Sequence, residues 1–102
     1  MYYLLYDCAF FARIFGMMEE RSEVLKAIGE RVRILRKLKG FSQEELAHNM
    51  GKDQPDLSRI ERGEVNPGAL TLIEIAHTLG VSPLEIFNHP TILKNDGERN
   101  NQ

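Results

Sequence analysis

Residues 42–63 contain two short amphipathic segments joined by a tight turn, and each segment begins with its own helix-start signal. Ser42 is followed three residues later by Glu45, the spacing of a capping box, in which side chain and backbone satisfy each other's free hydrogen-bonding groups. A first helix is therefore expected from about Gln43. Gly51 follows the apolar residues of this helix, and glycine readily adopts the positive φ found at helix ends. The chain is expected to turn there.

The second segment predicts a helix that packs across the first. Asp53 is placed to cap it, and Pro55 falls in the first turn, where proline is tolerated because those backbone N–H groups lack partners within the helix. Leu57 and Ile60 are spaced to face the same side, and Gly63 marks the end. Two short helices joined in this way form a helix-turn-helix unit.

Together these residues resemble the helix-turn-helix of the Cro and lambda-repressor family of bacterial and phage regulators, also called the xenobiotic-response-element type. The match extends over roughly residues 25–88, and fixed spacing over most of a domain is far more specific than one short motif. It rests on Arg36, residues 42–47, Gly51, residues 57–63, Asn66 with Pro67, and residues 72–80. The resemblance implies an all-α, five-helix lambda-repressor-like domain that binds double-stranded DNA, usually as a homodimer.

The resemblance and the chemistry of the DNA grooves suggest which side chains contact DNA. The second helix of the unit, called the recognition helix, fits the major groove, and residues near its N-terminal end contact base edges. The amide of Gln54 suits adenine, while Arg59 suits either guanine or a phosphate. Pro55 has no donor and Asp56 is negative, and both residues also suit a helix start, so the sequence preference stays open. The expected base contacts are Gln54, Pro55, Ser58 and Arg59, and the expected phosphate contacts are Gln43, Lys52 and Arg62.

The resemblance also implies a long-range ion pair. In this family an arginine of the first helix lies against the glutamate at the end of the recognition helix, and Arg36 and Glu61 occupy the matching positions. We expect this pair to hold the recognition helix at a fixed angle and not to contact DNA.

Residues 1–18 differ sharply from the rest of the chain, since they contain all three tyrosines and three of the five phenylalanines. The segment is too short and too aromatic for a membrane span, which needs about 20 apolar residues, and it lacks the basic start of a signal peptide. An extra hydrophobic helix that contacts another subunit or a protein partner is expected. The alternatives are an irregular tail, or an upstream start with Met17 or Met18 as the true first residue. The apolar stripe of such a helix would be Leu4, Cys8, Phe11, Phe15 and Met18.

The chain is expected to divide into a hydrophobic N-terminal extension (1–21), a helix-turn-helix domain (22–88) and a polar tail (89–102). Ser22 is placed to cap the first helix of the domain, which ends near Gly40. Ile34 and Leu38 lie off the core stripe of that helix and suggest a second contact surface. A fourth helix is expected before Gly80, and a short fifth helix after Ser82. The expected core stripe of the first helix is Leu25, Ile28, Val32 and Leu35.

Composition limits the alternatives. A chain of 102 residues forms one small domain, and its net charge of −2 and pI near 5.9 give no overall attraction to nucleic acid, so DNA binding requires a local basic face. The single cysteine cannot form an intrachain disulfide, which suits the cytoplasm. The histidines lack metal-ligand spacing, and neither a phosphate-binding glycine loop nor a nucleophile with its base is recognisable. We expect no enzyme, metal site or cofactor.

The sequence therefore predicts a sequence-specific transcriptional regulator, most simply a dimeric repressor of a pseudopalindromic operator. Two alternatives stay open. One is an antitoxin or a restriction-modification controller, in which the same fold also binds a toxin or governs its own operon. The other is a protein-interaction module that retains the fold without recognising DNA, because fold alone does not fix function.

Overall fold

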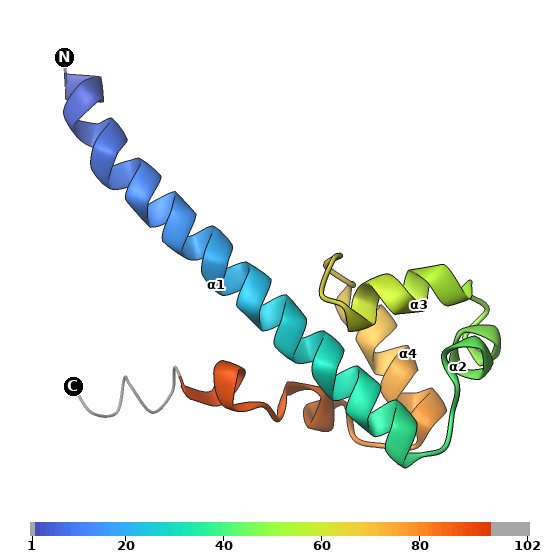
Figure 1. Cartoon of the computed structure of the whole chain (residues 1–102). Coiled ribbons are helices and arrows are strands. Elements are labelled where there is room, and N and C mark those ends of the chain that lie inside the picture. The colour runs from blue at the N-terminus through green and yellow to red at the C-terminus, as the bar shows by residue number, and fades with distance from the viewer. Residues whose placement is uncertain (1, 95–102) are drawn as a thin grey trace.

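The computed structural model describes residues 2–94, with side-chain surroundings from residue 16 onward, and every regular element in this part is helical (Figure 1). The expected all-α, five-helix architecture is confirmed. The fifth helix is a 3₁₀ helix rather than an α-helix. Within the described residues no helix is long and apolar enough to cross a membrane. The elements are α1 (Tyr2–Leu38), α2 (Gln43–Asn49), α3 (Gln54–Glu61), α4 (Ala69–Leu79) and η1 (Pro83–Phe87).

The hydrophobic N-terminal segment is the first half of α1, and the helix passes through Ser22 without interruption. The expectation that Ser22 begins a helix is therefore wrong. Serine or glycine in a helix interior costs about 1 kcal/mol or less, whereas nucleating a new helix fixes several residues for one hydrogen bond. Extending one helix past Gly16 and Ser22 is consequently more favourable than ending it and starting another.

α1 is much longer than the domain that it supports. Its 37 residues correspond to about 55 Å of helix, and the longest dimension of the molecule is 56 Å. Figure 1 shows the first half of α1 projecting away from the other helices, while the second half packs among them. The predicted polar tail continues past residue 94, so residues 95–102 lie outside the described part of the chain.

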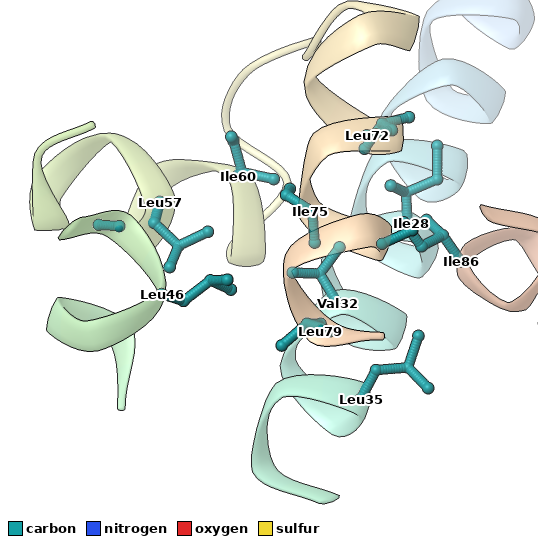
Figure 2. Close-up of a cluster of buried hydrophobic side chains, with 12 residues drawn as sticks. Ile28, Val32, Leu35, Leu46, Leu57, Ile60, Leu72, Ile75, Leu79 and Ile86 are labelled. Carbon is teal, nitrogen blue, oxygen red and sulfur yellow. The ribbon is translucent and has the colours of Figure 1, made fainter. Parts of the chain in front are cut away.

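The core lies where the second half of α1 meets the other four helices, and Figure 2 shows apolar side chains from all five elements converging there. Each element supplies one of the five largest fully buried side chains, and burying a side chain of this size contributes about 1.5–3 kcal/mol. These residues are Val32, Leu46, Leu57, Ile75 and Ile86. Seven more residues complete the cluster: Ile28, Leu35, Ala47, Ile60, Leu72, Ala76 and Leu79.

Two apolar residues lie at the edge of the core, and one of them, Leu25, was expected inside it. Met50 packs against the cluster but is only partly buried, and Leu25 is also partly buried. Leu25 lies one turn before Ile28, at the level where α1 leaves the domain. Leu38, which lies off the core stripe, is 74% exposed.

The two helices of the central unit begin differently. In α2 the capping box is present, with Ser42 Oγ accepting from the Glu45 N–H at 3.0 Å and Glu45 Oε1 accepting from the Ser42 N–H at 3.1 Å. Asp53 occupies the N-cap of α3 as expected, but its side chain makes no capping hydrogen bond. A capping side chain accepts from the second or third N–H of the helix. Pro55 has no N–H, and the Asp56 N–H already donates to the backbone oxygen of Asp53 at 3.1 Å.

Candidate nucleic-acid interface

α2 and α3 are joined by a turn that brings their first residues together. Gly51 adopts a φ of +69°, and the Lys52 N–H donates to the Ala47 oxygen at 2.8 Å, which closes the end of α2. Gln43 and Gln54 are the first residues of the two helices. The Gln54 amide Nε2 donates to Gln43 Oε1 at 2.7 Å, and both side chains are partly buried.

This contact is one end of a hydrogen-bonded network that reaches α1. Gln43 Nε2 donates to Glu61 Oε1 at 2.9 Å, and the Arg36 guanidinium donates to both oxygens of Glu61, at 2.6 and 3.1 Å. Arg36 also donates to the Phe41 backbone oxygen at 2.8 Å. Arg36 and Glu61 are 7% and 8% exposed, so the expected ion pair is present and buried. The network links both ends of α3 to α2 and to α1.

The inner face of α3 explains the environment of Ser58. Gln54, Ser58 and Glu61 are separated by four and three residues, so they lie on one face of the helix, which is turned toward α2. Ser58 is only 9% exposed, and its hydroxyl accepts a hydrogen bond from the Arg62 guanidinium. Ser58 is therefore the least exposed of the four expected base contacts, and its hydroxyl oxygen already accepts one hydrogen bond.

The outer face of α3 consists of exposed residues. Pro55, Asp56 and Arg59 are exposed there, and the Arg59 guanidinium donates to the Asp56 carboxylate at 2.7 Å. Both side chains of this pair are about half exposed, at 48% and 53%. An exposed pair of this kind contributes about 0–1 kcal/mol, so Arg59 can exchange Asp56 for another anion.

A second exposed acid lies beside Arg62. The Arg62 guanidinium donates to both oxygens of Glu64, at 2.6 and 3.2 Å. The hydrogen bond from Arg62 lowers the pKa of Glu64, and the same bond raises the pKa of Arg62. At neutral pH the two groups are therefore ionised and mutually neutralised, which reduces the local positive charge of this face.

A shallow pocket adjoins the outer face of α3. It has a volume of about 190 Å³, and Lys52 from the turn lies at it beside Asp56 and Arg59. Thr71 at the start of α4 and residues of the loop before α4 close the other side. Lys52, Arg59 and the pocket thus share one surface, which is continuous with the start of α3.

The structure thus places together residues that the sequence left separate. It joins Gln43 to Gln54 and Glu61, and it couples Arg59 and Arg62 to acidic neighbours. The spacing of Asp56 and Arg59 on one helix is a sequence signal for their pairing. The contact between Gln43 and Gln54 has no such signal, because it depends on how α2 and α3 cross.

The architecture defines a lambda-repressor-like helix-turn-helix domain. Residues 32–86 match the model of the helix-turn-helix family HTH_3, and the chain belongs to this family. It is a protein of the DNA-binding, transcription-regulator class.

Three comparisons illustrate the relationship. The uncharacterized HTH-type transcriptional regulator y4dJ of Sinorhizobium fredii is 42% identical over 64 residues, which span 63% of this chain and 83% of that protein. The immunity repressor protein of Bacillus phage phi105 is 30% identical over 69 residues, 68% of this chain and 48% of that protein. The crystal structure of the restriction-modification controller protein C.AhdI from Aeromonas hydrophila has a TM-score of 0.63 and 36% identity, covering 65% of this chain and 96% of that one.

Proposed function

We propose that this protein binds specific DNA sequences by inserting α3 into the major groove, and that it represses transcription by occupying an operator. The orientation of the Gln54 amide is the observation that supports this most. Its nitrogen has two N–H groups, and the bond to Gln43 uses one of them. The second N–H and the amide oxygen remain for the N7 and N6 groups of adenine, which need one donor and one acceptor.

The other residues of α3 contribute in different ways. The exposed ring of Pro55 offers an apolar surface for the methyl group of thymine. In the complex with DNA, the Arg59 guanidinium exchanges its ion pair with Asp56 for two hydrogen bonds to guanine or to a phosphate. The Ser58 hydroxyl is buried and accepts from Arg62, while its own O–H can still donate, so Ser58 serves mainly to orient Arg62.

Phosphate contacts position the domain without specifying sequence. Lys52 and Arg62 supply positive charge on either side of α3, and Arg62 exchanges Glu64 for a phosphate. The side chain of Gln43 is used at both of its polar atoms, by Gln54 and by Glu61. Gln43 therefore positions Gln54, and its remaining amide N–H contacts a phosphate.

A homodimer completes the proposal. Two copies related by a two-fold axis present two α3 helices to a pseudopalindrome, with half-sites separated by a helical turn or a multiple of it. The similarity to the phage immunity repressor supports repression rather than activation. A protein with this function acts in the cytoplasm, where the DNA lies, and needs no cofactor.

One alternative role has a specific observation in its favour. The similarity to the restriction-modification controller C.AhdI covers nearly the whole of that protein, so a controller that governs its own operon is the second candidate. Both roles use the same DNA-binding surface. The genes beside this one would separate them, because a controller is encoded next to a restriction enzyme and its methyltransferase.

Selection of bound duplexes from a random DNA pool tests the proposal. We expect a two-fold symmetric motif, with an affinity that falls steeply as the salt concentration rises. Binding without any recovered motif, or no binding at low salt, would contradict it and favour a protein-interaction module.

A further inference from the structure

An open apolar groove lies where α1 leaves the domain. Its volume is about 350 Å³, and no residue expected to contact DNA lines it. Leu25 and Val24 are only partly buried there, and Met17 is 60% exposed. Apolar side chains of α1 thus stay partly exposed along the groove, although Val24 also packs against the core cluster. The lining residues are Met17, Glu20, Arg21, Val24, Leu25 and Ile28 of α1, together with Asn66 of the loop before α4.

Beyond the groove α1 continues toward its N-terminus, away from the domain (Figure 1). The stretch from residue 2 to residue 16 adds about 22 Å of helix. In sequence, Asp7 and Arg13 are the only charged residues between positions 2 and 18. A helix that is apolar on all sides is normally buried against another element.

The apolar groove and the aromatic N-terminal end belong to the same rigid element, so they cannot meet within one molecule. A continuous helix does not fold back on itself, and residues 2–6 lie about 30 Å along the helix axis from Leu25. They can meet between two molecules. The N-terminal end of α1 from a second copy of the chain is therefore the segment that can fill the groove.

We propose that two copies of this chain associate through the first halves of their α1 helices, packed antiparallel. The N-terminal end of each helix then lies in the groove of the other copy, against Val24 and Leu25. This deepens the homodimer of the proposed function by naming its interface.

The antiparallel direction follows from the position of the domain on α1. Positions 17, 24, 28, 32 and 35 form one stripe with steps of three, four or seven residues. The domain covers the second half of this stripe, through Ile28, Val32 and Leu35. In a parallel pair facing through the stripe, the two domains would occupy the same space, and the Arg21 side chains of the two copies would face each other, a repulsion of like charges. An antiparallel pair places the domains at opposite ends.

Association of the free chain tests the interface without DNA. We expect the full chain to sediment as a dimer at micromolar concentration. Leu25→Lys should raise the dissociation constant of the dimer at least tenfold. Met17→Lys, at an exposed position, is a second variant that should also weaken it without affecting folding. Leu84→Lys is the matched control, because Leu84 is 76% exposed on η1 and lies outside the groove. Circular dichroism verifies that each variant remains folded.

The direction of packing is tested by a distance between spin labels. In a Cys8→Ser background, a label introduced by Arg33→Cys should lie about 55 Å along the helix axis from its twin, with the two-fold axis near residue 14. A parallel pair would give a far shorter distance.

Three outcomes would overturn the proposal: a monomeric parent chain, a dimer sensitive to Leu84→Lys but not to Leu25→Lys or Met17→Lys, or a short distance between the labels. A monomeric parent would leave the first half of α1 for a different protein. None of these outcomes bears on whether Gln54 recognises a base, which the DNA selection tests separately.

Discussion

Arg36 and Glu61, which lie 25 residues apart in sequence, form a bidentate ion pair between α1 and the end of α3, with Nε–Oε2 at 2.6 Å. The pair is buried, and Gln43 and the Phe41 oxygen satisfy further polar groups around it. Buried charges are stable only when paired and hydrogen-bonded. This pair therefore joins α1 to the end of α3 through a buried contact in which both charges are hydrogen-bonded.

Removing one partner of this pair should destabilise the fold strongly. Arg36→Ala leaves the Glu61 carboxylate buried without its counter-charge, and breaking such a pair costs about 3–5 kcal/mol. Urea denaturation of the DNA-free protein measures the loss. Arg33→Ala, at an exposed position of the same helix, is the control and should change stability by about 0.5 kcal/mol or less. Equal losses for the two variants would contradict the structural role of Arg36.

Replacing both charges should be less damaging than replacing one. The double variant Arg36→Met, Glu61→Leu removes the cost of burying two charges together with the attraction between them. We expect it to be more stable than Arg36→Ala in the same denaturation assay, while losing DNA affinity because Gln43 no longer has an acceptor in Glu61. A double variant less stable than Arg36→Ala would show that the polar network itself is indispensable to the fold.

Replacing Gly29 or Gly16 of α1 by alanine should change the stability of the protein in opposite directions. A Cβ on Gly29 would lie 2.4 Å from the backbone oxygens of Ile60 and Glu61, so Gly29→Ala must push α3 away from α1. Overpacking of this kind costs about 1–3 kcal/mol or more. A Cβ on Gly16 meets nothing within 4 Å, and Gly16→Ala should stabilise the helix by about 0.5–1 kcal/mol. Thermal melts of the two variants should shift in opposite directions, and a shared direction would contradict the close crossing at Gly29.

The starts of α2 and α3 offer a further comparison. Ser42→Ala removes a capping hydrogen bond and should cost about 0.5–2 kcal/mol. Asp53→Ala removes a side chain that makes no capping bond, so only the interaction of its charge with the helix dipole is lost, about 0.3–1 kcal/mol. We expect denaturation to show the larger loss for Ser42→Ala. The opposite order would mean that Asp53 caps α3 in solution.

Glu64 should oppose DNA binding because it neutralises Arg62. Glu64→Gln removes the charge while keeping the shape, which frees Arg62 for a phosphate. We expect tighter binding. We also expect the plot of log affinity against log salt concentration to become steeper by about 0.9, the contribution of one added phosphate contact. Fluorescence anisotropy at several salt concentrations measures both. Glu19→Gln makes the same charge change on an exposed part of α1 and serves as the control. If both variants gain equally, net charge rather than Arg62 is responsible.

Local signals in the sequence were sufficient where the structure is determined locally. The capping box at Ser42, the glycine turn at Gly51 and the apolar stripe through Val32 each follow from spacing, and the structure has all three. Arg36 and Glu61 lie 25 residues apart, so their pairing followed only from the resemblance to a known family.

Features that depend on competition between alternatives were not predictable in this way. Ser22 is a good capping residue, yet α1 continues through it because propagation is favoured over a new start. The contact between Gln43 and Gln54 depends on the crossing of α2 and α3. Ser58 is buried by that same crossing, although its position on the face of Gln54 and Glu61 was visible in the sequence.

The most direct test of the account is the sequence preference of Gln54→Ala, measured as the ratio of affinities for the selected duplex and for a scrambled duplex. Asn88→Ala, which removes an exposed amide outside α2 and α3, is the matched control. We expect Gln54→Ala to lose about 1–3 kcal/mol of discrimination at one position in each half-site while its binding to the scrambled duplex stays unchanged. The control should keep the parent ratio. If Gln54→Ala retained the full preference, α3 would not be recognising bases through this residue, and the proposed mechanism would be wrong.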